Sequence, residues 1–196
     1  MAQVAIRYWH LFNVGVSDLD MANYLGGLMS EVKGSGEDRE SSLVGSFPIR
    51  APVWWGRRGD SRSHPELPGV SGRFILLCHP KSFRRFEGML AKLLRAPKDL
   101  RRPLDEMNSL LWELSNGHRT FEEIVEIMDE TFTEQIAPAP ERTEAALRLL
   151  GERGFLLFSK TEFEDVWLTG PGINPSGEII QINGVDTSPI DGDKIE

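Results

Sequence analysis

The residues best suited to nucleophilic or metal chemistry in this chain are one cysteine and four histidines. Cys78 and His79 are adjacent in a segment with the composition of a strand, where neighbouring side chains point to opposite faces. A thiol–imidazole pair is therefore disfavoured, and a buried structural cysteine beside an exposed histidine is the simpler interpretation. His10, His64 and His118 are scattered and lack the spacing of metal or triad motifs.

Other patterns that carry chemistry are also missing from the sequence. A single cysteine excludes an internal disulfide and any multi-cysteine metal site. The sequence has no glycine-rich phosphate loop, nucleotide fingerprint or HExxH motif. The acids between Glu122 and Glu130 have the spacing of a solvated helix face. We therefore predict no catalytic residue, no bound metal, no cofactor and no enzymatic activity of the chain's own.

Three segments have the residue types of strands. Pro48–Trp55 is short, aromatic and interrupted by proline, which suits an edge strand. Gly72–His79 is rich in β-forming residues and stops at Pro80, and Leu100–Leu104 is a short extended segment. A fourth, brief apolar strand is expected at Phe155–Phe158.

Helical patterns dominate the region after Leu104. One helix is expected from Asp105 to Asn116, and a second from Phe121 to Phe132. Thr120 followed by Glu123 predicts a capping box at the start of the second helix. Pro138–Pro140 is expected to break the chain before a third helix, which runs over Glu141–Arg153 and ends at Gly154.

Charge is unevenly distributed along a chain whose net charge is −8. Eight cations and two acids lie between Lys81 and Arg102, whereas two lysines and eight acids follow from Lys160 onward. The acidic total argues against nucleic acid as a partner. The segment 81–95 has the pattern of a basic amphipathic helix, which could lie on an anionic membrane or hold an acidic partner. A helix packed on its own domain with a solvated cationic face is the favoured interpretation.

Composition predicts extensions at both ends. Residues 1–47 are expected to be an N-terminal extension with a polar linker, and residues 160–196 an acidic, partly disordered tail. The sequence contains no run of about 18 apolar residues, so we expect no transmembrane helix, and its first residues lack the pattern of a signal peptide. Together with the single cysteine, this favours a cytoplasmic protein.

Several short motifs follow one another in order within residues 100–158. They are Leu104–Asp105–Glu106, Trp112–Glu113–Leu114, Asn116–Gly117, Arg119–Thr120, Glu123–Ile124 and Arg153–Gly154–Phe155. In order and spacing they resemble the PqqD family, the recognition element of ribosomal-peptide modification systems. The likeness extends more loosely to residues 48–159, which we interpret as a PqqD-like peptide-binding domain.

The resemblance implies an α+β, winged-helix-like fold, with a three-stranded antiparallel sheet beside a bundle of three helices. It also implies an adaptor without catalytic residues, which captures the leader of a precursor peptide and presents it to a modifying enzyme, often a radical-SAM protein. In the family the leader adds as a strand to the third strand of the sheet and lies against the third helix. Carried over to this chain, the peptide-binding residues are Leu100, Arg101, Arg102, Leu104, Ala146, Leu147 and Leu150.

The chemistry of these residues supports their assignment to peptide binding but leaves alternatives open. An edge strand offers unpaired N–H and C=O groups, and Arg101 and Arg102 favour an acidic peptide. Pro103 removes one ladder bond, and Leu147 and Leu150 are as well explained by core packing. The alternatives are an accessory or scaffold subunit of a larger complex and, less favoured, a winged-helix DNA-binding protein. The tail strand Glu178–Ile182 could also occupy the basic cleft as a self-inhibitory pseudo-leader.

Overall fold

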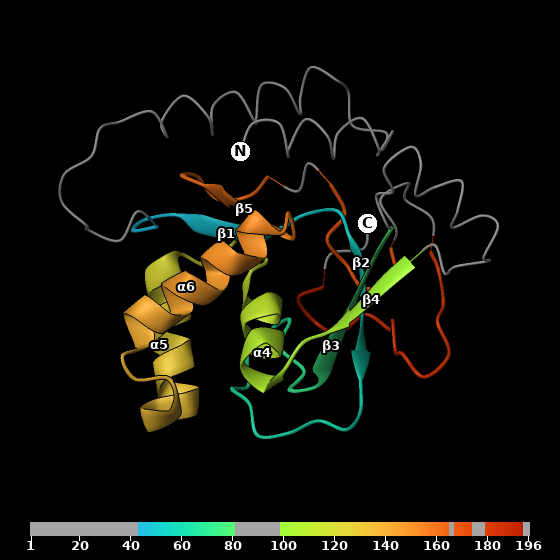
Figure 1. The fold of residues 1–196 in the computed structure, drawn as a ribbon, viewed down its shortest axis with the longest axis horizontal. Coiled ribbons are helices and arrows are strands. Elements are labelled where there is room, and N and C mark those ends of the chain that lie inside the picture. Colours follow the sequence, from blue (N-terminus) through green and yellow to red (C-terminus); the bar gives the residue numbers. More distant parts are fainter. Residues whose placement is uncertain (1–42, 81–98, 165–166, 174–178, 194–196) are drawn as a thin grey trace, which may run out of the picture.

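The computed structural model describes residues 43–80, 99–164, 167–173 and 179–193, and Figure 1 shows how their elements are arranged. The strands are β1 (Phe47–Arg50), β2 (Trp54–Arg58), β3 (Phe74–Pro80), β4 (Asp99–Pro103) and β5 (Leu156–Ser159). The helices are α4 (Glu106–Leu114), α5 (Phe121–Phe132), the short 3-10 helix η1 (Thr133–Gln135) and α6 (Ala139–Glu152). The basic helix predicted at 81–95 and almost all of the N-terminal extension lie outside the described residues.

The described strands form two antiparallel sheets. β3 is the central strand of a three-stranded sheet in the order β2-β3-β4, and β1 pairs with β5 in a second, two-stranded sheet. The predicted α+β class, with a three-stranded antiparallel sheet beside three helices, is confirmed. The three helices pack side by side next to the larger sheet (Figure 1).

The structure corrects one predicted strand, because Pro48–Trp55 is divided between the two sheets. β1 pairs with β5, and β2 pairs with β3. The division falls at Pro52, which has no N–H to donate to a ladder. Just before it, the Ala51 N–H donates to the Phe155 carbonyl oxygen at 2.9 Å, and the chain leaves one sheet for the other.

The helix boundaries follow local capping chemistry. The Asp105 carboxylate accepts from the Asn108 N–H at 2.8 Å and caps α4. The predicted capping box of α5 is confirmed, since the Thr120 hydroxyl and the Glu123 carboxylate each accept from the other's backbone N–H. α6 begins earlier than predicted, because Pro140 lies in its first turn, where no intrahelical donor is needed. None of the described helices is long and apolar enough to cross a bilayer.

One hydrophobic core lies between the three helices and the larger sheet. Trp55 of β2 and Trp112 of α4 meet edge to face in it, with ring centroids 6.2 Å apart. Both rings are almost completely buried. The core therefore joins β2, an edge strand of the larger sheet, directly to α4, the first helix of the bundle.

The beginning of the tail is part of the folded unit. Phe163 and Trp167 are buried against Ile49 in a second, smaller apolar cluster. The Trp167 indole N–H donates to the Arg50 carbonyl oxygen at 2.9 Å, and that of Trp55 donates to the Thr169 carbonyl oxygen at 2.9 Å. These contacts dock the tail against β1 and β2.

Candidate peptide-binding face

Among the described residues, β4 is paired on one side only, by β3. The Leu104 N–H donates to the Ile75 carbonyl oxygen at 2.9 Å, and this bond fixes the alternation of the ladder. Arg102 therefore turns its backbone groups toward β3. Arg101, which stands opposite Cys78, turns its N–H and C=O outward.

Pro103 also stands at an outward position, opposite Leu76. Its missing N–H removes no bond from the ladder between β3 and β4. The loss expected from the sequence falls instead on the outer edge of β4, which no other described residue pairs and which we call the free edge. Between Leu100 and Leu104, that edge offers one N–H, from Arg101, and the carbonyl groups of Arg101 and Pro103. An added strand can pair with it over only a short length.

The side chains of β4 alternate between the two faces of the sheet. Leu104 is 9 % exposed and belongs to the core. Arg102 lies on the same face, with its guanidinium carbon 5.7 Å from the ring centroid of Phe155, just after α6. Leu100 is half-buried, whereas Arg101 is exposed on the other face.

The leucines proposed on α6 are core residues. Leu147 is 0 % exposed and Leu150 is 2 % exposed, and both pack in the main hydrophobic cluster. Their side chains cannot contact a peptide on the surface, so their role is structural. Ala146 is partly exposed at the edge of the same cluster and stays a candidate contact.

A different set of residues lines the accessible side of α6. Arg142, Ala146, Leu149 and Arg153 are spaced by four, three and four positions, which places them on one stripe of the helix. We refer to these four residues as the α6 stripe. Leu149 is 45 % exposed and was not predicted. The signal that could have found it is its i+3 relation to Ala146, together with the flanking arginines.

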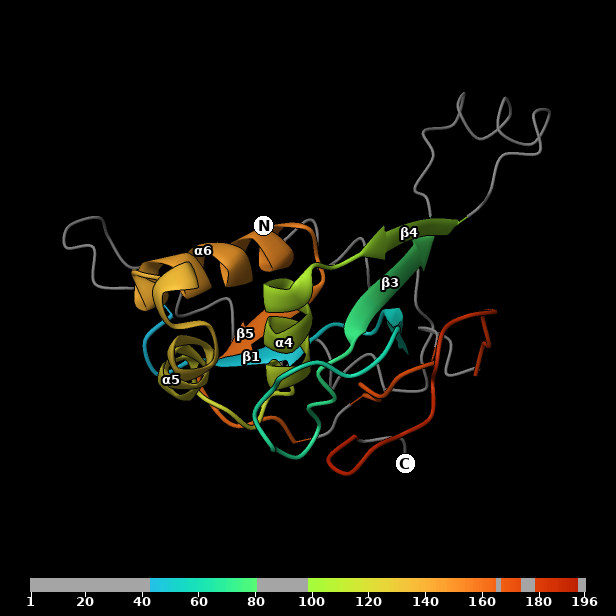
Figure 2. The ribbon, with the colours of Figure 1, turned by 90° about the horizontal axis from the view of Figure 1, so that it is seen from below.

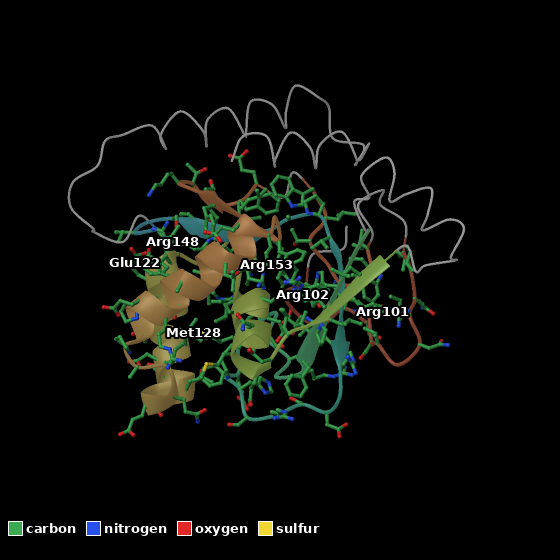
Figure 3. The ribbon with its side chains drawn as sticks, in the orientation of Figure 1. Arg101, Arg102, Glu122, Met128, Arg148 and Arg153 are labelled. Carbon is green, nitrogen blue, oxygen red and sulfur yellow. The ribbon has the colours of Figure 1, made fainter. Side chains whose placement is uncertain are left out.

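The α6 stripe lies on the flank of α6 away from β5. Gly151 is two and a half turns after Arg142 and therefore on the opposite side of the helix, and a Cβ at Gly151 would lie 2.7 Å from the Phe158 ring of β5. Figure 2 shows β4 and α6 along the same side of the molecule with α4 between them. Figure 3 shows the labelled Arg153, Arg102 and Arg101 following one another from the end of α6 to β4. This side of the molecule therefore combines a free strand edge with cations and an exposed leucine.

A buried ionic cluster, absent from the sequence predictions, lies at the opposite edge of the sheet. The Arg57 Nε donates to the Glu113 carboxylate at 2.8 Å, and its terminal nitrogens donate to the Asp193 carboxylate at 2.8 and 3.0 Å. All three side chains are at most 1 % exposed. Arg50 stacks on Trp55 nearby, and burial lowers the pKa of its guanidinium to about 10 against the opposing attraction of Asp193.

The residues considered for catalysis lie on separate segments. Cys78 is partly exposed on β3, and His118, in the turn before α5, pairs with Glu162 at 2.8 Å. His64 contacts the Arg62 carbonyl oxygen at 2.6 Å in the loop after β2. Within the ranges that the structure describes, no group of three His, Cys, Asp or Glu side chains could hold a metal ion.

The chain matches no family model, no curated protein and no solved structure in comparisons with known proteins. The resemblance to the PqqD family therefore rests on the motif residues alone. In the structure, Trp112–Glu113–Leu114 forms the buried end of α4, and Arg153–Gly154–Phe155 leads from α6 into β5.

Proposed function

We propose that this chain is a non-catalytic peptide-binding adaptor. It captures an extended precursor or leader peptide by strand addition to β4 and presents it to a modifying enzyme. As part of the same proposal, its fold is winged-helix-like and its residues 48–159 are a PqqD-like domain.

The free edge of β4 is the observation that carries the proposal. Arg101 directs both its N–H and its C=O away from β3, and such groups are the usual source of affinity in strand addition. Pro103 shortens the edge and leaves Arg101 as the residue that sets the register of an added strand. A short edge of this kind also resists indiscriminate strand pairing, because one donor position is blocked.

Side chains around this edge define the class of peptide. Arg101 and Arg102 flank the added strand, and Arg153 extends the positive charge to the end of α6 (Figure 3). Ala146 leaves room for a side chain, and Leu149 offers it apolar surface. The preferred ligand is therefore an acidic peptide with an apolar residue that faces α6.

The test compares two substitutions at one position. Peptides are selected from a random display library on the wild-type chain, and the best one is synthesised and measured by isothermal titration calorimetry. Arg101→Pro removes the outward N–H but no bond to β3, and it should weaken binding at least ten-fold through the lost hydrogen bond and charge. Arg101→Ala keeps the N–H and should weaken binding by about three-fold, through charge alone.

Equal affinities for both variants would remove strand addition to β4 from consideration. Urea unfolding of Arg101→Pro checks that the ladder with β3 remains intact. N-methylation of single peptide amides gives the reciprocal measurement on an unchanged chain. At least one N-methyl position opposite Arg101 should then abolish binding.

A further inference from the structure

The outer edge of β2 is already occupied by a strand-like piece of the chain itself. The Arg57 N–H donates to the Asp186 carbonyl oxygen and the Asp186 N–H donates to that of Arg57, both at 2.8 Å. We call residues 179–193 the C-terminal segment. The sequence had suggested that part of this tail occupies the basic cleft at β4 as a pseudo-leader. The Ile180 carbonyl oxygen instead accepts a hydrogen bond from the Trp54 indole at 2.8 Å, so Ile180 lies at β2 and not at β4.

One carboxylate anchors the C-terminal segment in the domain. Asp193 forms a bidentate pair with Arg57, and its side chain is 0 % exposed. The same carboxylate accepts from the Ile190 N–H at 2.9 Å, so the turn over 190–193 presents it to the guanidinium. Glu113 holds the other side of Arg57, and Arg50 places a second buried cation in the field of Asp193.

Charge balance at this site depends on the segment. Arg50 and Arg57 are buried cations, and Glu113 of α4 and Asp193 are the carboxylates that act on both. Without Asp193, two buried cations would face one carboxylate. A peptide that binds this edge of β2 must therefore supply a carboxylate to balance the two buried cations.

The C-terminal segment otherwise lies on the surface. None of its residues is buried as a whole, and Ile179 is 76 % exposed. The described residues before it, 163–164 and 167–173, include three buried apolar side chains, those of Phe163, Trp167 and Ile173. Main-chain pairing, one buried acid and little buried apolar surface are the features of a bound peptide more than of a core element.

The surface of β2 is shaped to receive this peptide. Gly56 has no side chain where Val185 crosses the strand, and a Cβ there would lie 2.5 Å from the Val185 Cγ1. The Gly69 N–H donates to the Asp191 carbonyl oxygen at 2.6 Å, and Arg73 pairs with the Asp186 carboxylate at 2.6 Å. The loop after β2 thus holds the far end of the segment.

We propose that the outer edge of β2 is a second peptide-binding site, specific for an extended acidic segment, and that the C-terminal segment occupies it as an exchangeable intramolecular ligand. A competing peptide needs one residue paired with Arg57 and an aspartate seven positions later. This site is separate from the β4 edge, so its fate does not depend on the proposed function.

The experiment loosens the intramolecular ligand in the full-length chain and offers it again in trans. Asp193→Asn removes the anchoring charge, and Asp191→Asn is the matched control because Asp191 is exposed two positions earlier. The probe is a fluorescein-labelled, amidated peptide of residues 179–194, followed by fluorescence anisotropy. An intramolecular ligand competes at an effective concentration of about millimolar, so the intact chain should bind the probe weakly.

The Asp193→Asn chain should bind the probe at least ten-fold more tightly than the wild type and the Asp191→Asn chain. The same probe with Asp193→Asn should bind at least ten-fold more weakly than the native probe. Hydrogen exchange should show the Arg57 amide losing protection while those of β3 and α4 keep theirs. Equal probe binding by all three chains, or cooperative unfolding of the whole domain in Asp193→Asn, would overturn the proposal.

Discussion

Leu147 and Leu149 are two residues apart on α6, yet Leu147 is 0 % exposed and Leu149 is 45 % exposed. Substitutions at these two positions therefore distinguish an effect on the stability of the fold from an effect on binding at its surface. A change at Leu147 acts on the core, and the same change at Leu149 acts on the α6 stripe.

Leu147→Asp should unfold the domain, because it places a charge among apolar side chains at a cost above about 4 kcal/mol. Leu149→Asp should leave stability within about 0.5 kcal/mol and weaken an acidic peptide at least five-fold through like-charge repulsion. Urea unfolding and calorimetric titration with the library-selected peptide measure the two effects. Full affinity in Leu149→Asp would remove the α6 stripe from the binding face.

Glu113 gives a second prediction, on the energy of the buried ionic cluster. Glu113→Gln leaves Arg57 with one carboxylate and should destabilise the fold by about 3 kcal/mol, since a buried charge loses a partner. Glu106→Gln is the control, because its pair with Arg62 is about half exposed and should contribute less than about 1 kcal/mol. Both values come from urea unfolding. Equal small losses in the two variants would contradict the structural importance of the cluster.

Local sequence signals predicted the helical part of the fold well. The capping box at Thr120 and the apolar periods of α4 and α5 depend on neighbours within a few residues, and these are visible in the sequence. The motif Asn116–Gly117 likewise marks a real turn, because Gly117 has a φ of +86°. Two strands of the larger sheet, β3 and β4, also lie close to their predicted segments, whereas β2 overlaps its predicted segment only at Trp54 and Trp55.

The unpredicted features depend on partners far away in the chain. β1 separates from β2 because β5, more than 100 residues later, pairs with it. Arg57 meets Asp193 across 136 positions, and no local pattern marks either as a partner of the other. At Leu147 and Leu150 the sequence left peptide binding and core packing open for the same reason, because only the packed helix shows that both face the core and that Leu149 faces solvent.

Gly117 gives a third prediction. An added Cβ would lie 2.5 Å from the Cβ of Phe163, in a backbone conformation that disfavours other residues. Gly45 has a similar φ of +64° but nothing within 4 Å of its Cβ position, so it is the control for backbone strain alone. Gly117→Ala should cost about 2 kcal/mol more than Gly45→Ala in thermal unfolding, owing to overpacking. Equal losses of stability in the two variants would mean that Phe163 moves away and that the added Cβ causes no overpacking.

Pro103 gives the last prediction, in which binding is gained. Pro103→Val places an N–H at an outward position of β4, next in line after that of Arg101. An extended peptide should then gain one hydrogen bond and bind about five-fold more tightly, while the ladder with β3 is unchanged. The variant should also self-associate more readily in sedimentation experiments, because a proline no longer interrupts the free edge.

Together with Arg101→Pro, this variant forms a graded series in which the free edge of β4 has no donor, one donor or two between Leu100 and Leu104. Affinity for one acidic peptide should rise along that series if the peptide adds to β4 as a strand. Side-chain charge does not explain such a rise, because the step from proline to valine adds none. An affinity that follows only the loss of Arg101, and ignores Pro103→Val, would instead mean that the peptide is held by cations alone and lies off the sheet.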